Sequence, residues 1–329
     1  MRHPAHLDTT RGTAAAGFSR RLVVAGLLAC LVEASASGGA RPAGLAAAGA
    51  WGLPAAVRAA DGAQGAPRRI ISLVPALTEM LFAIGAGPQV VGVSSYDMYP
   101  PEAATRPRVG ALLDPDVERV LSLTPDLVAI YGSQSDLRRQ LERATIPIYD
   151  YRHAGLPDIL LTIRDLGRVT GHAWSAEVVA TGIERELAAV RARVGTRAPL
   201  RTVLVFGREP GALRNIYASG GTGFLHDMLV AAGGVNVFAD LPQQAVQATT
   251  ELLLTRAPDV ILEVRDGPAY SPAQVTQAVA DWSRLASVPA VKHGRVHVVS
   301  GEGLVVPGPR VAGAVARLAR VLHPGAFAP

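Results

Sequence analysis

The sequence has 329 residues, of which 49% are hydrophobic and 18% are charged. This length and apolar content suit one large or two ordinary domains, and they exclude a chain that is disordered throughout, because disorder requires low hydrophobicity and high charge. The only cysteine, Cys30, excludes a disulfide framework, a cysteine-rich zinc site and an iron–sulfur cluster.

The net charge of +5 is concentrated in the first 60 residues, which hold six arginines against two acidic residues. The rest of the chain therefore carries a net charge of only +1. Because nucleic-acid binding requires a basic surface on the folded part of a protein, we expect no nucleic acid among the partners.

Residues 1–67 are predicted to form a signal sequence and an Ala/Gly/Pro-rich leader. Arg20 and Arg21 precede the apolar run 22–32, which has the length of a signal-peptide core and is too short for a stable membrane span. Cleavage after Ala36 or Ala59 fits the small-x-small pattern, and a twin-arginine signal is an alternative. The sequence Leu-Leu-Ala-Cys at 27–30 offers a lipid anchor at Cys30. Each route predicts export to the periplasm or cell envelope.

From residue 68 onward, short apolar runs alternate with helical patterns, which is typical of parallel α/β sheets. In an amino-terminal lobe at 68–172 we predict strands at 70–73, 89–93, 127–130 and 148–149 and helices at 75–84, 115–123, 135–144 and 156–170. The longest helical pattern, 174–194, lies in an inter-lobe segment at 173–197. In a carboxyl-terminal lobe at 198–329 we predict strands at 202–206, 236–238, 260–264 and 295–299 and helices at 223–232, 249–255, 274–285 and 311–322.

The two series of elements resemble each other. The sequence LTEMLFAIG at 77–85 matches LHDMLVAAG at 225–233, and ERVL at 118–121 followed by Pro-Asp matches ELLL at 251–254 followed by Pro-Asp. The offset falls from 148 to 133 residues between these landmarks, so the first lobe contains an insertion, which includes the aromatic loop 96–101. An internal repeat on both sides of a long helix predicts two related lobes.

Motifs of enzyme chemistry are scarce. The sequence has no nucleophile elbow, P-loop or His-Glu-x-x-His motif. His293 and His297 are four residues apart, but Gly294 and a predicted strand exclude the helical geometry of an i, i+4 metal pair. We therefore predict a protein that is not an enzyme and has no resident metal or cofactor.

Residues suited to recognition are better represented. Tyrosines lie at predicted strand ends or in loops, and Arg208, which follows the strand 202–206, can present a planar cation to a ligand. In open α/β sheets, the carboxyl ends of the strands face the ligand crevice. Individually such residues are usually surface or packing residues, but together they favour a cleft that stacks on a large flat ligand. The tyrosines are Tyr96, Tyr99, Tyr131, Tyr151 and Tyr217.

Several separate motifs follow one another along both lobes. The first lobe holds IISLVPALTE at 70–79, VGVSSY at 91–96 and ERVLSLTPDL at 118–127, and the second holds YASG at 217–220, AGG at 232–234 and NVF at 236–238. In this order they resemble the periplasmic iron-chelate/vitamin B12-binding proteins of ABC importers. The resemblance covers about residues 68–323. It implies the architecture of class III periplasmic binding proteins, in which two Rossmann-like α/β lobes with parallel sheets are joined by one long helix and close only slightly.

The resemblance implies an exported, monomeric solute-binding protein that captures a corrinoid (vitamin B12-like) or related metal chelate in the inter-lobe cleft. It would deliver this ligand to an ABC permease dimer with ATPase subunits. The sequence is similar to the vitamin B12-binding members, whose cleft aromatics fall on Tyr96, Tyr131 and Tyr217 and whose acidic cleft residue falls on Glu302. It departs from them at Leu112 and Ala245, where those members carry tryptophans, and near Val306, where they carry an arginine.

Glu118 and Glu251 occupy equivalent places in the repeat, each seven residues before a Pro-Asp pair. One interpretation is that both stabilise their helices, because a helix dipole favours glutamate in the first turn. The resemblance implies another role, docking on the permease, because family members dock through one glutamate per lobe against permease arginines.

Two rival functions stay open. A ferric siderophore binder of the same family would grip anionic arms through Arg208 and Arg214, and a haem binder of the family is a further alternative. A secreted two-domain hydrolase would need a nucleophile–base pair that the sequence does not reveal.

Overall fold

The computed structural model describes residues 65–152 and 154–328, so the signal sequence and Cys30 lie outside the described residues. The first lobe contains a four-stranded parallel sheet in the order β2-β1-β3-β4. Its strands are β1 (Ile70–Ser72), β2 (Val90–Val93), β3 (Leu127–Tyr131) and β4 (Ile148–Tyr151). Its helices are α2 (Pro75–Ala83), α3 (Val117–Ser122), α4 (Ser135–Arg143) and α5 (Leu156–Thr170). These elements agree with the predicted ones to within a few residues.

The second lobe contains a mixed sheet in the order β10-β9-β5-β6-β8, with β7 also paired to β5. Its strands are β5 (Leu200–Gly207), β6 (Ile216–Ser219), β7 (Gly234–Asn236), β8 (Ala245–Ala248), β9 (Val260–Arg265) and β10 (Val296–Ser300). Its helices are α7 (Phe224–Ala231), α8 (Thr250–Arg256), α9 (Pro272–Asp281), α10 (Pro289–Lys292) and α11 (Val311–Leu322). The α/β class is confirmed, but β6 and β8 run antiparallel to their neighbours, which corrects the expectation of a purely parallel sheet.

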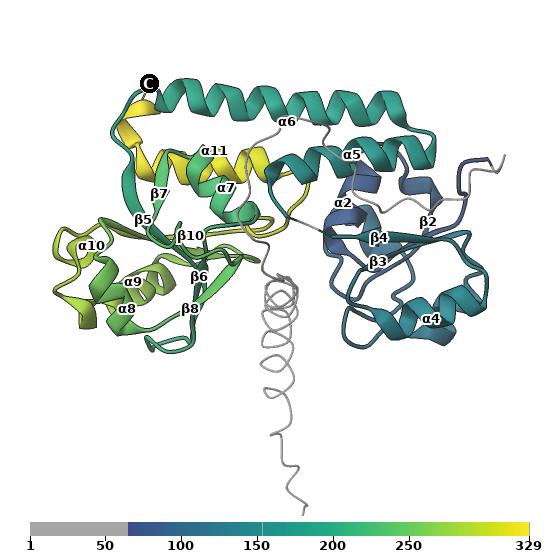
Figure 1. Cartoon of the computed structure of the whole chain (residues 1–329), viewed down its shortest axis with the longest axis horizontal. Coiled ribbons are helices and arrows are strands. Elements are labelled where there is room, and N and C mark those ends of the chain that lie inside the picture. Colours follow the sequence, from purple (N-terminus) through teal and green to yellow (C-terminus); the bar gives the residue numbers. More distant parts are fainter. Residues whose placement is uncertain (1–64, 153, 329) are drawn as a thin grey trace, which may run out of the picture.

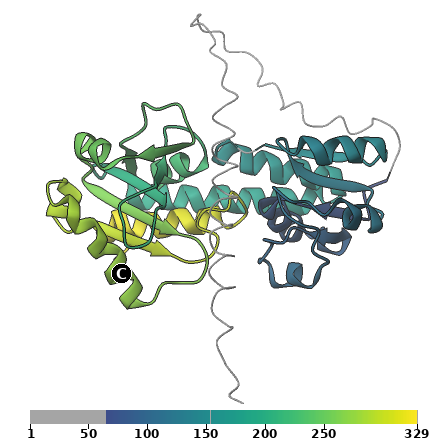
Figure 2. The same ribbon diagram turned by 90° about the horizontal axis from the view of Figure 1, so that it is seen from below.

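A single long helix, α6 (Ala173–Val194), joins the lobes. Figure 1 shows it above both lobes, with α5 below it on one side and α11 on the other. The close approach of α5 and α6 depends on Gly167, where a Cβ atom would collide with the side chain of Ala176. Seen from below in Figure 2, the lobes lie side by side and α6 crosses from one to the other.

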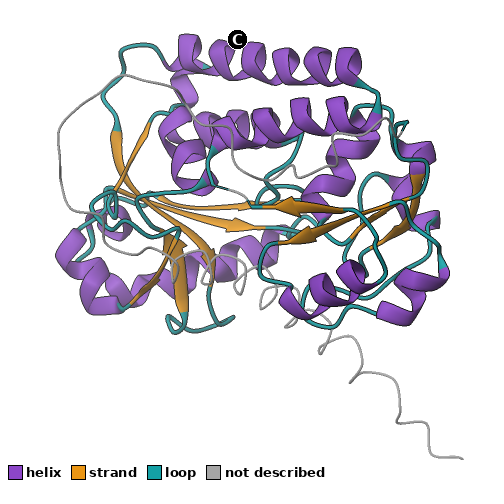
Figure 3. Cartoon of the chain, turned by 45° about the vertical axis from the view of Figure 1, so that its right-hand side comes forward, coloured by secondary structure: helices purple, strands orange, loops and turns teal. Residues whose placement is uncertain are grey.

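Each sheet lies between two layers of helices (Figure 3). Each strand contributes side chains to the cores on both faces of its sheet, because successive residues of a strand point to opposite faces. In β1, Ile70 belongs to the core on the α6 side and Ile71 to the core on the opposite side. In β9, Leu262 and Ile261 divide in the same way.

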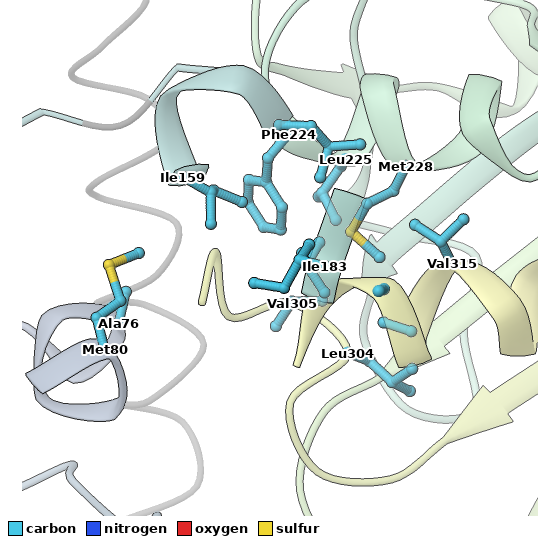
Figure 4. Packing of buried hydrophobic residues seen from close by; sticks show 14 of the residues in the cluster. Ala76, Met80, Ile159, Ile183, Phe224, Leu225, Met228, Leu304, Val305 and Val315 are labelled. Carbon is cyan, nitrogen blue, oxygen red and sulfur yellow. The ribbon is translucent and has the colours of Figure 1, made fainter. Parts of the chain in front are cut away.

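The core on the α6 side is continuous between the lobes, whereas each lobe has a separate core on the opposite side. The continuous core contains residues of α2 and α5 from the first lobe and of α7 and α11 from the second. In Figure 4, Phe224 of α7 and Ile159 of α5 point toward each other. The lobes also share a hydrogen bond, from the amide of Leu156 in α5 to the carboxylate of Asp227 in α7, at 2.8 Å. A shared core of this kind opposes wide hinge opening.

The internal repeat extends to backbone conformation. Helices α2 and α7 occupy the matching segments, and the glycines after them, Gly85 and Gly233, both have left-handed φ values, +90° and +85°. Thr124 and Ala257, at the ends of α3 and α8, both have φ of +43°. These shared conformations indicate that the two lobes are related structural units, as the repeat predicts.

Candidate functional site

Loops that follow the parallel strands of the two lobes meet between the lobes. Tyr99 lies in the loop after β2, and Arg310 lies at the end of the loop after β10. The Arg310 guanidinium lies over the Tyr99 ring, 4.0 Å from its centroid. The same guanidinium forms an ion pair with Glu79 of α2, with Nε and Oε2 2.9 Å apart. The carboxyl ends of the two sheets therefore face each other, which is where α/β proteins bind ligands.

Two of the predicted tyrosines lie at this end of the first sheet. Tyr96 is half-buried in the loop after β2, and Tyr131 is the half-buried last residue of β3. Strands β2 and β3 both run parallel to β1, so both tyrosines lie at the carboxyl end of the same sheet. The Tyr131 ring contacts the ring of Tyr151, with centroids 5.6 Å apart. Tyr151 itself is buried in the core, so it supports Tyr131 and is not exposed to a ligand.

Polar contacts fix the positions of the loops that carry these tyrosines. The buried Gln134 accepts a hydrogen bond from the amide of Tyr131 at 3.0 Å and donates one to the carbonyl of Leu112 at 3.1 Å. In the other loop, Asp97 accepts a hydrogen bond from the amide of Ser94 at 2.6 Å. Arg108 donates to the carbonyl of Asp97, also at 2.6 Å. Burial raises the pKa of Asp97 to about 7.

Tyr217 and Glu302 contribute to the facing edge of the second lobe. Tyr217 lies within β6, which was not predicted as a strand, and its ring contacts that of Phe206 with centroids 6.4 Å apart. Glu302 is exposed in the loop after β10. Strands β9 and β5 lie between β10 and β6, so three inter-strand steps separate the two positions, a width of about 14 Å.

Arg208 is not placed as the sequence predicted. Its side chain is only 1% exposed, and its guanidinium forms ion pairs with Glu263 and Asp281, each at 2.9 Å. Its remaining N–H groups donate to three backbone carbonyls. The prediction of a ligand-facing cation at Arg208 is therefore corrected, because buried acidic residues from β9 and α9 enclose this side chain.

The positions that depart from the vitamin B12-binding pattern are small or apolar in the structure as well. Leu112 is half-buried in the loop before α3, Ala245 is the buried first residue of β8, and Val306 is half-buried in the loop between β10 and α11. The aromatic surface available from these positions is smaller than the tryptophans of the resemblance would provide.

The two glutamates of the repeat are exposed at equivalent places. Glu118 is the second residue of α3 and Glu251 is the second residue of α8. Helix α3 packs on the first sheet and α8 on the second, each on the face opposite the continuous core. Hydrogen bonds from its own amide and from Thr249 and Thr250 lower the pKa of Glu251. The structure therefore presents one glutamate per lobe in the layer of helices opposite α6.

Sequence reasoning missed the cluster of Glu79, Tyr99 and Arg310 as a unit. Glu79 is buried, with a side chain 4% exposed, in a helix whose other residues are mostly apolar. A lone carboxylate in such a helix signals a buried ion pair. Its partner lies 231 residues away, so no local pattern could identify it.

Among residues 65–152 and 154–328, no set of three or more His, Cys, Asp or Glu side chains is arranged to hold a metal ion. None of the helices that the structure describes is long and apolar enough to cross a bilayer.

Two α/β lobes that face each other with their strand ends and share one long helix define the architecture of a class III binding protein. The comparisons agree: the chain belongs to the periplasmic binding protein family, whose model matches residues 70–301.

Two curated relatives are similar in sequence along most of their length. A vitamin B12-binding protein of Pectobacterium carotovorum is 30% identical over 229 residues, covering 68% of this chain and 79% of the relative. An uncharacterised ABC transporter substrate-binding lipoprotein of Bacillus subtilis is 30% identical over 266 residues, covering 79% and 82%.

Two solved structures share the fold. The periplasmic vitamin B12-binding protein of Vibrio cholerae is 25% identical, with a TM-score of 0.65, over 81% of this chain and all of that one. A periplasmic haem-binding protein of Roseiflexus, in its apo form, is 26% identical, with a TM-score of 0.65, over 80% of this chain and all of that one.

Proposed function

We propose that this protein is exported, captures a corrinoid or a related metal chelate between its lobes, and delivers it to an ABC permease. One observation carries the proposal: Tyr96 and Tyr131 lie at the carboxyl end of the first sheet, and Tyr217 pairs with the last residue of β5 in the second, in a chain that is 30% identical to a vitamin B12-binding protein over 229 residues. Relatives with this architecture are named as binders of vitamin B12 and haem, both of which are large and flat.

The geometry suits such a ligand physically. Tyr96 and Tyr131 from one lobe and Tyr217 from the other offer ring faces and edges to a planar macrocycle, and each aromatic contact contributes about 0.5–1.5 kcal/mol beyond the area that it buries. Glu302 offers a carboxylate that can accept hydrogen bonds from the amide arms of a corrinoid. Capture requires little movement, because the continuous core already holds the lobes together.

Calorimetric titration of the purified protein with cyanocobalamin, haem and a ferric siderophore tests the proposal. Binding of cyanocobalamin supports a corrinoid as the ligand. Tighter binding of haem or of the siderophore would instead identify that compound as the ligand. Each Tyr-to-Ala change at 96, 131 and 217 is expected to weaken binding by about 1–2 kcal/mol, whereas Tyr-to-Phe changes at the same positions should retain most of the affinity. Unchanged affinity in the triple alanine variant, with normal thermal unfolding, would contradict this site.

We propose further that Glu118 and Glu251 dock the protein, as a monomer, on a permease dimer that works with ATPase subunits. Two like carboxylates on equivalent helices can meet two like cations on a symmetric partner, and exposed charges of this kind steer encounter and fix register. Reversing both to Arg should leave ligand affinity unchanged but abolish uptake and weaken permease binding, most clearly at low salt. Glu186→Arg, on the exposed face of α6, is the matched control. Normal uptake in the double variant would exclude these glutamates as the docking pair.

The attachment of the exported protein is a separate question. The relative from Bacillus subtilis is a lipoprotein, which supports lipidation at Cys30 as the alternative to cleavage after Ala36 or Ala59. Mass spectrometry of the protein recovered from cell envelopes distinguishes an amino terminus at diacylated Cys30 from an unmodified amino terminus after Ala36 or Ala59.

A further inference from the structure

Three segments that are distant in sequence converge on Arg310. This residue immediately precedes α11 in the second lobe. Its guanidinium donates two hydrogen bonds to the carboxylate of Glu79, in α2 of the first lobe, and lies 4.0 Å from the centroid of Tyr99, in the loop after β2. Paired donation by a guanidinium to a carboxylate fixes direction as well as distance.

The surroundings of Arg310 are built closely around it. Gly303 has a left-handed φ of +75°, and a Cβ atom there would collide with the Arg310 guanidinium. Gly308 lies next to Glu79, since a Cβ atom there would be 3.3 Å from Oε2. The loop from Gly301 to Arg310 therefore takes a shape that leaves space for this ion pair.

Each of the two loops joined by Arg310 is also held within its own lobe. In the second lobe, the carboxylate of Asp266 accepts a hydrogen bond from the amide of Leu304 at 2.7 Å. In the first lobe, the loop after β2 is held by the contacts of Asp97 and Arg108. The contact of Arg310 with Tyr99 joins two loops that are each already ordered.

Stabilisation of the fold does not by itself explain the ion pair of Glu79 and Arg310. Burial raises the pKa of Glu79 above its ordinary value, even though the hydrogen bonds and charge of Arg310 act to lower it. Buried ion pairs of this kind often add little net stability compared with apolar residues, and their best-attested use is to fix the register of two packed elements. Here the ion pair joins α2 of the first lobe to the Gly301–Arg310 loop of the second, and the same guanidinium contacts Tyr99 in the loop after β2.

We propose that Arg310 is a positioning residue: together with Glu79 it holds the Tyr96–Tyr99 loop of one lobe against the Gly301–Arg310 loop of the other, and so sets the separation of the ligand-facing side chains before ligand arrives. The link to ligand affinity rests on the proposed function, whereas the link to lobe geometry does not. Preorganisation of this kind raises affinity because the ordering cost is met before binding.

The chain offers a matched control. Arg256 also forms a double contact with a carboxylate, that of Asp240, at 2.8 and 2.9 Å, and lies over the ring of Phe238 at 5.7 Å. Its side chain is 28% exposed, compared with 25% for Arg310, so the two arginines match in exposure, whereas the carboxylate of Asp240 is 57% exposed and that of Glu79 4%. Because all three of these residues lie in the second lobe, Arg256→Lys tests the same kind of substitution without a contact between lobes.

The experiment compares Arg310→Lys, Tyr99→Leu and Arg256→Lys. Spin labels at Arg119→Cys and Leu254→Cys, exposed on α3 and α8, report the inter-lobe distance in a Cys30→Ser background. Without ligand, we expect the distance distribution of Arg310→Lys and Tyr99→Leu to be broader than that of the unchanged protein. We expect no broadening in Arg256→Lys. Cyanocobalamin affinity should fall about fivefold in the first two variants, the equivalent of one cation–π contact.

The outcomes distinguish the role of Arg310 in lobe geometry from the identity of the ligand. A broadened distribution supports the role of Arg310 even if cyanocobalamin does not bind, in which case only the proposed ligand is wrong. An unchanged distribution in folded Tyr99→Leu and Arg310→Lys overturns the inference, whatever the ligand affinity. Tyr99→Leu changes a side chain that is 39% exposed, so this variant keeps the test decisive if Arg310→Lys fails to fold.

Discussion

Replacing Arg208 by alanine is expected to destabilise the second lobe without a comparable loss of ligand affinity. The substitution removes two ion pairs and three hydrogen bonds to carbonyls, and it leaves the carboxylates of Glu263 and Asp281 buried with fewer partners. Glu263 keeps the indole N–H of Trp282 at 2.7 Å and the guanidinium of Arg265, so the loss falls most heavily on Asp281.

The expected magnitude follows from the burial of these groups. Breaking a buried ion pair by removing one partner costs about 3–5 kcal/mol. For a folded unit of this size, that corresponds to a lowering of Tm by roughly 10 °C. Urea denaturation followed by circular dichroism measures the free energy of unfolding, and calorimetric titration with cyanocobalamin well below Tm measures the affinity.

Two comparisons sharpen this test. Arg214→Ala removes an exposed ion pair with Glu209 and should change stability by less than about 1 kcal/mol. Adding Asp281→Asn to Arg208→Ala removes a buried charge and should restore part of the lost stability. The assignment of Arg208 to the core would be refuted if Arg208→Ala abolished binding while its unfolding curve matched that of the unchanged protein.

Two further predictions concern pH and shape. Burial raises the pKa of Asp97 from 3.8 to about 7, so the folded state binds this proton more tightly than the unfolded state. The contribution of Asp97 to the free energy of unfolding is therefore most favourable below pH 4. It falls by about 1.4 kcal/mol per pH unit up to pH 7 and is constant above it. Denaturant unfolding of Asp97→Asn between pH 5 and pH 8 should show this slope reduced relative to the unchanged protein, and parallel profiles would contradict the assignment. Small-angle scattering should give the same radius of gyration with and without ligand, because α6 and the continuous core span both lobes, and a large decrease on binding would show that the lobes hinge.

The local order of elements was accessible from the sequence because helices and buried strands have distinct periodicities. The helix predicted at 156–170 has the same bounds in the structure, and the inter-lobe helix differs by one residue at its start. The internal repeat also indicated the paired lobes correctly, since related sequences adopt the same backbone conformations.

Strands β6 and β8 escaped prediction for a physical reason. Each has only four residues, IYAS and AVQA, and neither presents a long apolar run. Their antiparallel pairing with β5 and with each other stabilises them, and such pairing depends on contacts between distant segments. Tyr217 was therefore expected in a loop, although it lies within a strand.

Only the tertiary structure decided the roles of the charged residues. Arg208 follows a strand as a ligand-binding cation would, but Glu263 and Asp281, 55 and 73 residues later, enclose it in the core. Arg310 looks like an ordinary residue before a helix, but it meets Glu79 across 231 residues and Tyr99 in the opposite lobe. Periodicity and propensity act over a few residues, whereas the burial and pairing of a charge depend on which distant elements the fold brings together.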